Sequence, residues 1–479
     1  MNNYRIESDS VGEKYVPKDA LYGVHTLRGL ENFNITGETI HPELINSLVL
    51  VKKACAIANY EAGILDIDKK EAILKACDDL LQGKYLENVK NDPIQGGAGT
   101  TANMNINEVI ANIADEYMGG TRGEYKYIHP NDDVNMGQST NDVFPTAGKI
   151  AALRLLPSLL NELNLLIDAL MEKAEEFDNV LKMGRTQLQD AVPIRLGQEF
   201  HAYVSVLERD KVRIEHAMES ISSINLGASA IGTGINVDLK YFDLIIPTLS
   251  SITGLKLSRP KDLIDETNNL DSLAELSSAL KINAINLSKI SNDLRLMSSG
   301  PKTMIGDINL PPRQNGSSIM PGKVNPVIPE VVTQVAYRVI GNDATISMCC
   351  EAGQLELNAF EPVTFYSLYQ SIEILAKAMN TLRINCIYGI TANVKKLDKD
   401  IAISVGIVTA LVPHIGYKKA AEIAKKALAE EKKVRDLVIE EGLMSKEDLE
   451  EIFDPKAMTK PGIVGRHLLI KKKSSEQSI

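Results

Sequence analysis

The stretch LPSLLNELNLLIDALMEKAEEF, Leu156 to Phe177, repeats apolar residues at steps of three and four positions. This spacing places the apolar side chains on one face of an α-helix, with a period close to a heptad. The same pattern recurs over 196–224 and 270–297, and two further helical runs cover 331–346 and 365–387. The sequence therefore predicts five long helices that pack through their apolar stripes.

These helices predict a mainly α fold built around a long central bundle. A helix of about 30 residues is roughly 45 Å long, which suits a long bundle. We expect an α-rich N-terminal domain over 1–140, the central helical-bundle domain over 141–395 and a small C-terminal α-rich domain over 396–479, where the helices shorten and the charge density rises. Several helices are apolar on more than one face, which predicts that bundles of different subunits associate.

Composition excludes several classes of protein. The 479 residues carry a formal net charge of −11, which disfavours nucleic acid and anionic membranes as partners. No stretch approaches the roughly 18 uninterrupted apolar residues of a membrane span, and the first residues lack an apolar signal core, so we expect a cytoplasmic protein. The five cysteines are odd in number and show no CxxC spacing, which indicates buried thiols rather than disulfides or a zinc site.

Three polar clusters lie outside the apolar stripes. In the first, the glycine-rich turn GGAG precedes Thr100 and a helical segment, and such a turn can bind a carboxylate through backbone N–H groups. The second presents Gln138, Ser139, Thr140 and Asn141, of which Ser139 or Asn141 could simply cap the following helix. The third places Thr186 and Gln187 just before a helix that we expect to start at Pro193.

A fourth polar segment, GSSIMPGKVNP, spans 316–326 and holds Ser317, Ser318, Lys323 and Asn325 between glycines and prolines. A solvated surface turn has a similar composition. However, many neutral donors and one cation also suit a small anion such as a dicarboxylate, and the chain has neither a GxxxxGK[ST] phosphate loop nor a metal-binding triad. The clusters together favour a dicarboxylate-binding enzyme.

The string GSSIMPGKVNP resembles, almost letter for letter, the signature loop of the fumarase/aspartase superfamily, whose members eliminate across a carbon–heteroatom bond to release fumarate. The segments 96–112 and 129–146 are similar to the other two signature segments. The resemblance extends from Arg5 to at least Gly465. It implies a homotetramer in which three subunits contribute to each site.

The resemblance also implies roles for individual residues. Ser317 would be the base that removes a proton from carbon 3, and Asn141 would contact the leaving group. The carboxylate that becomes doubly charged, forming the aci-carboxylate intermediate, would be held by Thr100, Ser139, Thr140 and Ser318. The other carboxylate would be held by Thr186, Lys323 and Asn325.

Within the superfamily, four differences favour the ammonia-lyases, which release ammonia from L-aspartate, over the hydratases, which release water from L-malate. Gln187 replaces a histidine of the hydratases, and a glutamine cannot exchange a proton. Ala98 and Thr140 replace two serines, and NLGASAIGTG at 225–234 resembles the ammonia-lyase form. Asp133 stands where the common family string continues with a histidine, so the secondary dicarboxylate site that hydratases have in this neighbourhood is in doubt.

Two alternatives stay open: a fumarate hydratase and a catalytically silent helical scaffold. The presence of Ser317, Lys323 and Asn325 argues against the scaffold. Nothing in the sequence demands an organic cofactor. Some ammonia-lyases of this kind are activated by magnesium, so the resemblance implies Mg2+ as an activator without indicating its ligands.

Overall fold

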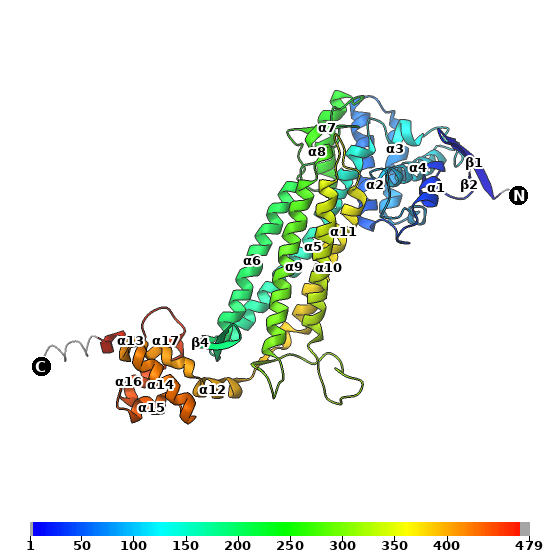
Figure 1. Ribbon diagram of the computed structural model, residues 1–479. Coiled ribbons are helices and arrows are strands. Elements are labelled where there is room, and N and C mark those ends of the chain that lie inside the picture. Colours follow the sequence, from blue (N-terminus) through cyan, green and yellow to red (C-terminus); the bar gives the residue numbers. More distant parts are fainter. Residues whose placement is uncertain (1–2, 470–479) are drawn as a thin grey trace. The chain divides into compact units, whose positions relative to one another are not determined.

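A computed structural model describes residues 3–469. The described part of the chain is dominated by helices, as predicted (Figure 1). The α-helices are α1 (Val24–Asn32), α2 (Pro42–Ala62), α3 (Ile67–Leu81), α4 (Thr100–Tyr117), α5 (Thr140–Glu176), α6 (Leu196–Ile221), α7 (Leu239–Thr253), α8 (Leu263–Asn268), α9 (Asp271–Met297), α10 (Val327–Glu351), α11 (Glu361–Asn385), α12 (Val394–Ile403), α13 (Val412–Ile415), α14 (Tyr417–Glu430), α15 (Val434–Glu440), α16 (Lys446–Ile452) and α17 (Pro455–Met458).

Six short strands form three antiparallel pairs in the described residues. They are β1 (Tyr4–Asp9) with β2 (Gly12–Pro17), β3 (Leu181–Thr186) with β4 (Gln189–Arg195), and β5 (Ile308–Asn309) with β6 (Thr391–Ala392). None of these strands was predicted from the sequence. In β1 the buried side chain is the charged Glu7, whereas Tyr4 and Ile6 are exposed, so the alternation is the reverse of the usual one.

The chain forms two compact units. Unit 1 comprises Met1–Asn161, Asp210–Ile285 and Val335–Lys377, and unit 2 comprises Glu162–Arg209, Asn286–Gln334 and Ala378–Ile479. The predicted division at 140 and 395 stays a prediction. Each of the five long helices contributes residues to both units: α5, α6, α9, α10 and α11. The two units therefore divide the chain at other places than the three predicted domains do.

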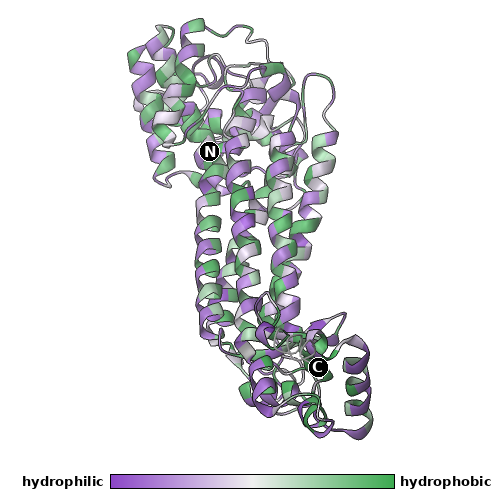
Figure 2. Cartoon of the chain, turned by 90° about the vertical axis from the view of Figure 1, so that its left-hand side faces the viewer, coloured by the Kyte–Doolittle hydropathy of each residue, from purple (hydrophilic) through white to green (hydrophobic). Residues whose placement is uncertain are grey.

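The five predicted long helices are α5, α6, α9, α10 and α11, and their segments lie side by side within each unit (Figure 1). Apolar and polar residues alternate along them in short steps, as the stripes require (Figure 2). Each fully buried Leu or Phe side chain stabilises the folded state by about 1.5–3 kcal/mol relative to an exposed one. In unit 1, a Cβ on Gly148 of α5 would lie 2.1 Å from the ring of Phe365, so only glycine permits this close approach to α11.

One described helix, α5, is long and apolar enough to cross a membrane by length and composition alone. The core helix of a soluble protein passes the same test. Its stripe residues Leu156, Leu159 and Leu163 have no exposed surface. We therefore interpret α5 as a core helix.

In unit 1, a buried carboxylate of α4 binds the N-terminus of α1. Glu108 on α4 accepts hydrogen bonds from the backbone N–H groups of Gly23, His25 and Thr26, at 2.8, 2.9 and 3.1 Å, and from the Thr26 hydroxyl. A carboxylate at a helix N-terminus satisfies N–H groups that lack a partner within the helix. Burial nevertheless raises the pKa of Glu108 to about 7. This carboxylate fixes α1 to α4.

The short helices near the C-terminus have a small apolar core of their own within unit 2. Leu411, Ile423, Leu437, Leu449 and Ile452 are fully buried in it. This agrees with the predicted shortening of the helices after residue 396.

Candidate active site

The first polar cluster forms a tight turn at the start of α4. Gly97, Ala98 and Gly99 all have left-handed backbone angles, with φ of 85°, 55° and 88°, and Thr100 is the first helical residue. A Cβ at Gly99 would lie 2.4 Å from the ring of Phe144. Glycine at position 99 therefore permits both the left-handed angle and the close approach of α4 to α5.

The second cluster forms the N-terminus of α5. Ser139 Oγ accepts a hydrogen bond from the backbone N–H of Asn141 (3.3 Å), and Asp142 Oδ1 accepts one from the backbone N–H of Ser139 (2.9 Å). This reciprocal arrangement resembles a capping box, with the Ser139 oxygen on the second helical N–H instead of the third. Of the two caps that the sequence left open, Ser139 and Asn141, it is Ser139 that caps the helix.

These two helix starts are joined in unit 1. The Asn103 side-chain amide of α4 donates to Thr140 Oγ1 at 3.1 Å. Helix N-termini carry partial positive charge and N–H groups without partners in the helix, which suit a carboxylate. Unit 1 therefore brings together four of the predicted residues, Thr100, Ser139, Thr140 and Asn141.

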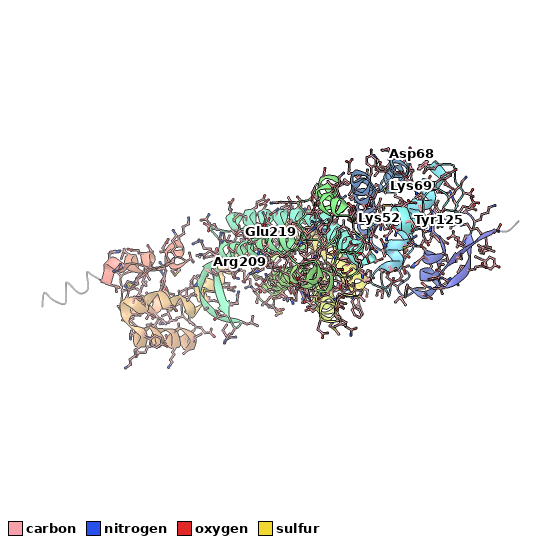
Figure 3. The ribbon with its side chains drawn as sticks, turned by 90° about the horizontal axis from the view of Figure 1, so that it is seen from above. Lys52, Asp68, Lys69, Tyr125, Arg209 and Glu219 are labelled. Atoms are coloured by element: carbon pink, nitrogen blue, oxygen red, sulfur yellow. The ribbon has the colours of Figure 1, made fainter. Side chains whose placement is uncertain are left out.

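A buried lysine lies behind this cluster. Lys52 of α2, labelled in Figure 3, has no exposed surface, and its Nζ donates to Asn135 Oδ1 (2.9 Å) and Gln138 Oε1 (2.8 Å). The side-chain amides of Asn103 and Asn107 donate to the same Asn135 oxygen. Burial lowers the pKa of Lys52 to about 8. The sequence analysis missed Lys52, although a lysine inside the apolar run LVLVKKACAIA was a usable signal.

The third cluster lies on a hairpin rather than before a helix. The expectation that a helix starts at Pro193 is wrong, because Pro193 lies in β4 and α6 begins at Leu196. Thr186 ends β3, and Gln187 and Leu188 form a two-residue turn with φ of 54° and 62°. Positive φ at both turn residues matches the twist of a hairpin. Thr186 and Gln187 are exposed at its tip.

A buried carboxylate holds the base of this hairpin. Asp307, which has no exposed surface, lies 2.6 Å from Arg185 Nη1 and 3.0 Å from Lys182 Nζ. Lys182 also pairs with Glu199 at 2.9 Å. A buried charge is tolerated when it is paired and hydrogen-bonded. The ion-pair network therefore fixes the strand that leads to Thr186.

The signature loop, residues 316–326, lies in unit 2 and turns back on itself. Gly316 N–H donates to the Lys323 carbonyl (2.8 Å), and Asn325 Nδ2 donates to the Gly316 carbonyl (2.8 Å). A Cβ at Gly316 would lie 2.6 Å from the Lys323 carbonyl oxygen, so this closure requires glycine. The loop contains Ser317, Ser318, Lys323 and Asn325, of which Ser318 and Lys323 are exposed.

Within this loop, Ser317 has two backbone donors. Its Oγ accepts hydrogen bonds from the N–H groups of Ile319 (3.2 Å) and Met320 (3.0 Å). N–H groups that already point at an oxygen stabilise negative charge developing on it. The geometry therefore suits a hydroxyl that passes through an anionic form.

Beside the loop lies a cleft of about 750 Å3 whose walls include Arg295, Lys323, Asn325 and Glu330. Arg295 lies 3.6 Å from the Glu330 carboxylate. Glu330 therefore pairs with a guanidinium of its own unit. No sequence pattern had singled out Arg295. The cleft adds a second cation near Lys323.

The ten predicted residues occupy four places: two helix starts in unit 1, and a hairpin tip and a loop in unit 2. No hydrogen bond or ion pair among residues 3–469 joins Thr186 or Gln187 to the loop around Ser317. Their roles remain predictions.

The secondary region at His129–Asp133 is internally bonded. The Asp133 carboxylate accepts from the His129 backbone N–H (2.8 Å) and from Lys69 Nζ (2.6 Å). His129 Nδ1 accepts from the backbone N–H groups of Asn131 and Asp132. Asp133 therefore stabilises the local fold, which agrees with the doubt about a dicarboxylate site here.

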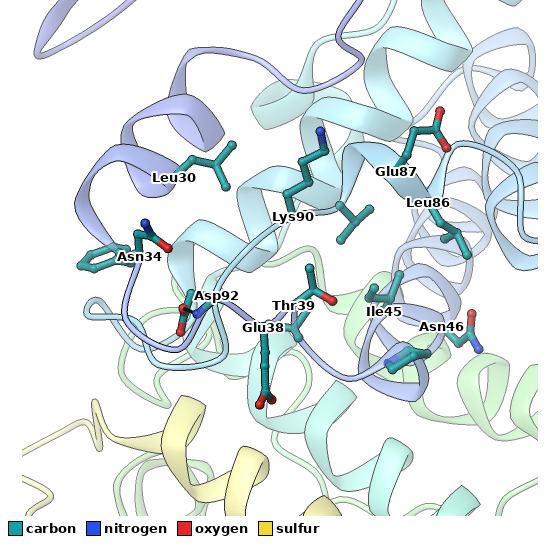
Figure 4. A pocket seen from close by; sticks show the side chains of 15 residues that line it. Leu30, Asn34, Glu38, Thr39, Ile45, Asn46, Leu86, Glu87, Lys90 and Asp92 are labelled. Atoms are coloured by element: carbon teal, nitrogen blue, oxygen red, sulfur yellow. Dashed lines mark hydrogen bonds between the residues drawn. The ribbon is translucent and has the colours of Figure 1, made fainter.

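A separate pocket of about 610 Å3 in unit 1 contains none of the predicted residues (Figure 4). Its walls include the apolar side chains of Leu30, Ile45 and Leu86, together with Lys90 and Glu38. This pocket is not the candidate site. No group of three His, Cys, Asp or Glu residues in the described chain is arranged to hold a metal ion, so the residues do not define a magnesium site.

Comparison with known proteins identifies the family. Residues 12–341 match the Lyase family model, and residues 407–460 match the model of the fumarase C C-terminus. The chain belongs to the fumarase/aspartase superfamily. It is 52% identical to an aspartate ammonia-lyase from Bacillus sp. over 96% of this chain and 99% of that protein.

Two solved structures of superfamily members share the fold. A fumarate lyase:delta crystallin from Brucella melitensis bound to cobalt is 48% identical, with a TM-score of 0.93 over 96% of this chain and 100% of the other. A class II fumarase from Schistosoma mansoni is 34% identical, with a TM-score of 0.92 over 96% and 99%. The match to the Lyase family model and the 52% identity to an aspartate ammonia-lyase make the chain a lyase of the carbon–nitrogen class.

Proposed function

We propose that the protein is an aspartate ammonia-lyase that reversibly eliminates ammonia from L-aspartate to give fumarate. The observation that carries this proposal is the 52% identity to the Bacillus enzyme over nearly the whole of both chains. Gln187 supports the same choice, since a glutamine at the hairpin tip cannot exchange protons as a histidine does.

In the proposed reaction, Ser317 Oγ removes a proton from carbon 3, and the electron pair passes to the neighbouring carboxylate as an aci-carboxylate. That pair then forms the double bond between carbons 2 and 3 as the carbon–nitrogen bond breaks and ammonia leaves. The N–H groups of Ile319 and Met320 stabilise the Ser317 oxyanion. Preorganised donors around the carboxylate that becomes doubly charged typically lower the barrier by about 3–4 kcal/mol each.

The two carboxylates are bound separately. Thr100, Ser139, Thr140 and Ser318 hold the one that becomes doubly charged. Thr186, Lys323 and Asn325 hold the other, with Gln187 beside them. The two helix starts in unit 1 support this division, because their partial positive charge stabilises the aci-carboxylate more than the singly charged form.

Asn141 binds the leaving amino group. Its Nδ2 donates to the Ala230 carbonyl at 2.7 Å, which turns Oδ1 away from that carbonyl. The atom left for the substrate is therefore an acceptor. An ammonium group has three donors and no acceptor, so this orientation suits an amine.

We also propose a homotetramer whose sites are shared by three subunits. Three exposed apolar side chains on one face of α10 support it, since Tyr337, Ile340 and Met348 are 63%, 37% and 73% exposed. Such a stripe suits burial against the bundle of another subunit. Light scattering coupled to gel filtration tests this, with a tetrameric mass expected and a monomeric mass contradicting it.

The proposed reaction needs no organic cofactor and takes place in the cytoplasm. We also propose that magnesium activates the enzyme without taking part in a chemical step. Rates measured with added magnesium and with EDTA test this last point. Activation by magnesium supports it, and equal rates contradict it.

The main test follows fumarate by its ultraviolet absorbance in three reactions: L-aspartate alone, L-malate alone, and fumarate with ammonium. We expect fumarate only from L-aspartate, and its loss with ammonium. The 34% identity to a class II fumarase makes the hydratase the second candidate. If fumarate appears from L-malate and not from L-aspartate, the protein is a fumarate hydratase. If absorbance changes in none of the three reactions, a catalytically silent scaffold is favoured.

A further inference from the structure

A segment of mostly small residues, 225–230, is hydrogen-bonded to the start of α5 in unit 1. Asn225 Nδ2 donates to the Asn141 carbonyl at 3.0 Å, and the Ala230 carbonyl accepts from Asn141 Nδ2 at 2.7 Å. Both polar ends of Asn141, its backbone carbonyl and its side-chain amide, are thus bonded to this segment. The orientation of Asn141 depends on where the segment lies.

Asp142 makes the central contacts. Its Oδ2 accepts from the backbone N–H groups of Gly227 and Ser229, both at 3.0 Å, while its Oδ1 accepts from the Ser139 N–H at 2.9 Å. The side chain has no exposed surface. An isolated buried carboxylate would be costly, so its three N–H partners are what make this position tolerable. One carboxylate thus ties the helix cap to the segment.

The segment needs this fastening because its backbone is strained. Ser229 has a left-handed φ of 59°, which costs a residue with a side chain about 1–2 kcal/mol. Gly227 has a φ of 98°, and a Cβ there would lie 3.0 Å from the ring of Phe242. The two N–H groups that Asp142 binds belong to these two residues. Without the carboxylate, the segment would lose the bonds that offset its strain.

We propose that Asp142 is a positioning residue: by tying residues 225–230 to the N-terminus of α5, it orients the Asn141 amide and the Ser139 cap for substrate. This inference rests on the proposed function for the roles of Ser139 and Asn141. Asp142 itself contacts no substrate. Its loss therefore weakens binding and turnover through Asn141 and Ser139.

The test compares Asp142→Asn with Asp262→Asn. Asp262 caps α8 in the same unit by accepting from the backbone N–H groups of Ile264 and Asp265. Both substitutions replace a carboxylate that binds backbone N–H groups, but Asp262 bonds to no candidate site residue. In Asp142→Asn we expect kcat/KM for L-aspartate to fall about 30-fold or more, and succinate to bind at least tenfold more weakly by calorimetry. In Asp262→Asn, kcat/KM and the affinity for succinate should stay within about twofold of the wild-type values.

Hydrogen exchange measured by mass spectrometry separates positioning from general instability. Peptides covering residues 225–236 should exchange faster in Asp142→Asn, whereas peptides of α9 should not. Unchanged kcat/KM and succinate affinity despite faster exchange would overturn the proposal. If Asp142→Asn is insoluble, Asn225→Ala takes its place, since it removes the bond to Asn141 while keeping Asp142. It should lower kcat/KM about tenfold, and an unchanged value would again overturn the proposal.

The two proposals fail in different ways. Wild-type protein that binds succinate but converts no L-aspartate overturns the proposed function alone, and the succinate affinities of the variants still decide the role of Asp142. Wild-type protein that neither binds succinate nor converts L-aspartate overturns both.

Discussion

The candidate residues of unit 1 and those of the signature loop in unit 2 are held in different ways. Thr140 and Asn141 are hydrogen-bonded to side chains or backbone of other elements, and Lys52 and Asp142 are buried beneath them. In unit 2, the described hydrogen bonds of residues 316–325 stay within the signature loop and the first turn of α10. One group is anchored by its surroundings, and the other is shaped by its own backbone.

This difference indicates a division of labour. Anchored donors need no reorganisation when a carboxylate arrives, so they suit binding and stabilisation of charge. A loop that carries its own internal bonds can move as a body and bring Ser317 and Lys323 to a bound substrate. Substitutions in unit 1 should therefore affect stability and activity together, whereas substitutions in the loop should affect activity alone.

The largest effect is expected for Ser317→Ala. Removing the base should lower kcat about a thousandfold, within the range of roughly 10²–10⁴ for general bases. The thermal midpoint should not change, because the loop is held by other bonds. Ser205→Ala is the control, since Ser205 is a half-buried serine of α6 whose hydroxyl donates to the His201 carbonyl. A Ser317→Ala protein that kept its activity would refute the base assignment.

Two lysines give the sharpest test of the comparison. Lys323→Met should lower kcat/KM at least about 100-fold with an unchanged free energy of unfolding, because Lys323 is exposed. Lys52→Met should lower both kcat/KM and the free energy of unfolding, the latter by roughly 1–3 kcal/mol, because it leaves Gln138 Oε1 without its donor and removes one of the three donors of Asn135 Oδ1. Urea unfolding and steady-state kinetics measure these effects. Equal destabilisation by both substitutions would contradict the division of labour.

Glu108 provides a pH-dependent test of unit 1. Burial raises its pKa from 4.5 to about 7, so the folded state holds this proton more tightly than the unfolded state. The resulting stabilisation is present below pH 4.5 and is lost as pH rises through about 7, by roughly 3 kcal/mol. The difference in unfolding free energy between wild type and Glu108→Gln should shrink accordingly between pH 5 and 8. A difference that stays constant would show that Glu108 does not titrate there.

The smallest effect is expected at the hairpin tip. Leu188→Gly should raise the free energy of unfolding by less than about 1 kcal/mol. Glycine adopts the left-handed angle of position 188 without strain, but it loses more backbone entropy on folding than leucine does, and the two effects nearly cancel. Activity should stay within twofold. The same change at Leu239, an exposed residue at the start of α7, should not stabilise, since glycine is a poor helix former. Thermal midpoints of the two variants should therefore shift in opposite directions.

The long helices could be predicted because their apolar stripes are regular and face a packed core. The stripe did not mark the start of α5, because Val143, Phe144 and Ala147 are all buried and the helix has no polar face there. Helix α5 begins at Thr140, 16 residues before the stripe, and only the possible cap at Ser139 or Asn141 indicated this start. The hairpin of β3 and β4 was missed because Pro193 indicated a helix start.

For the candidate site, the residues could be named but not their supports. Ser317 and Asn141 belong to recognisable motifs, whereas Lys52 and Asp307 act through partners that are distant in sequence. Asp307 is 122 residues from Arg185. Such ion pairs leave no local pattern, so only the folded chain reveals them.

The burial of the cysteines has a practical consequence for labelling. All five thiols are free, and burial raises the pKa of each, to about 12 for Cys55, Cys77 and Cys386. Because alkylating reagents attack the thiolate, the native protein should be nearly inert to maleimides. A cysteine introduced at the exposed Ile319 would then carry a fluorophore at one defined place, and the signature loop could be watched opening and closing in real time.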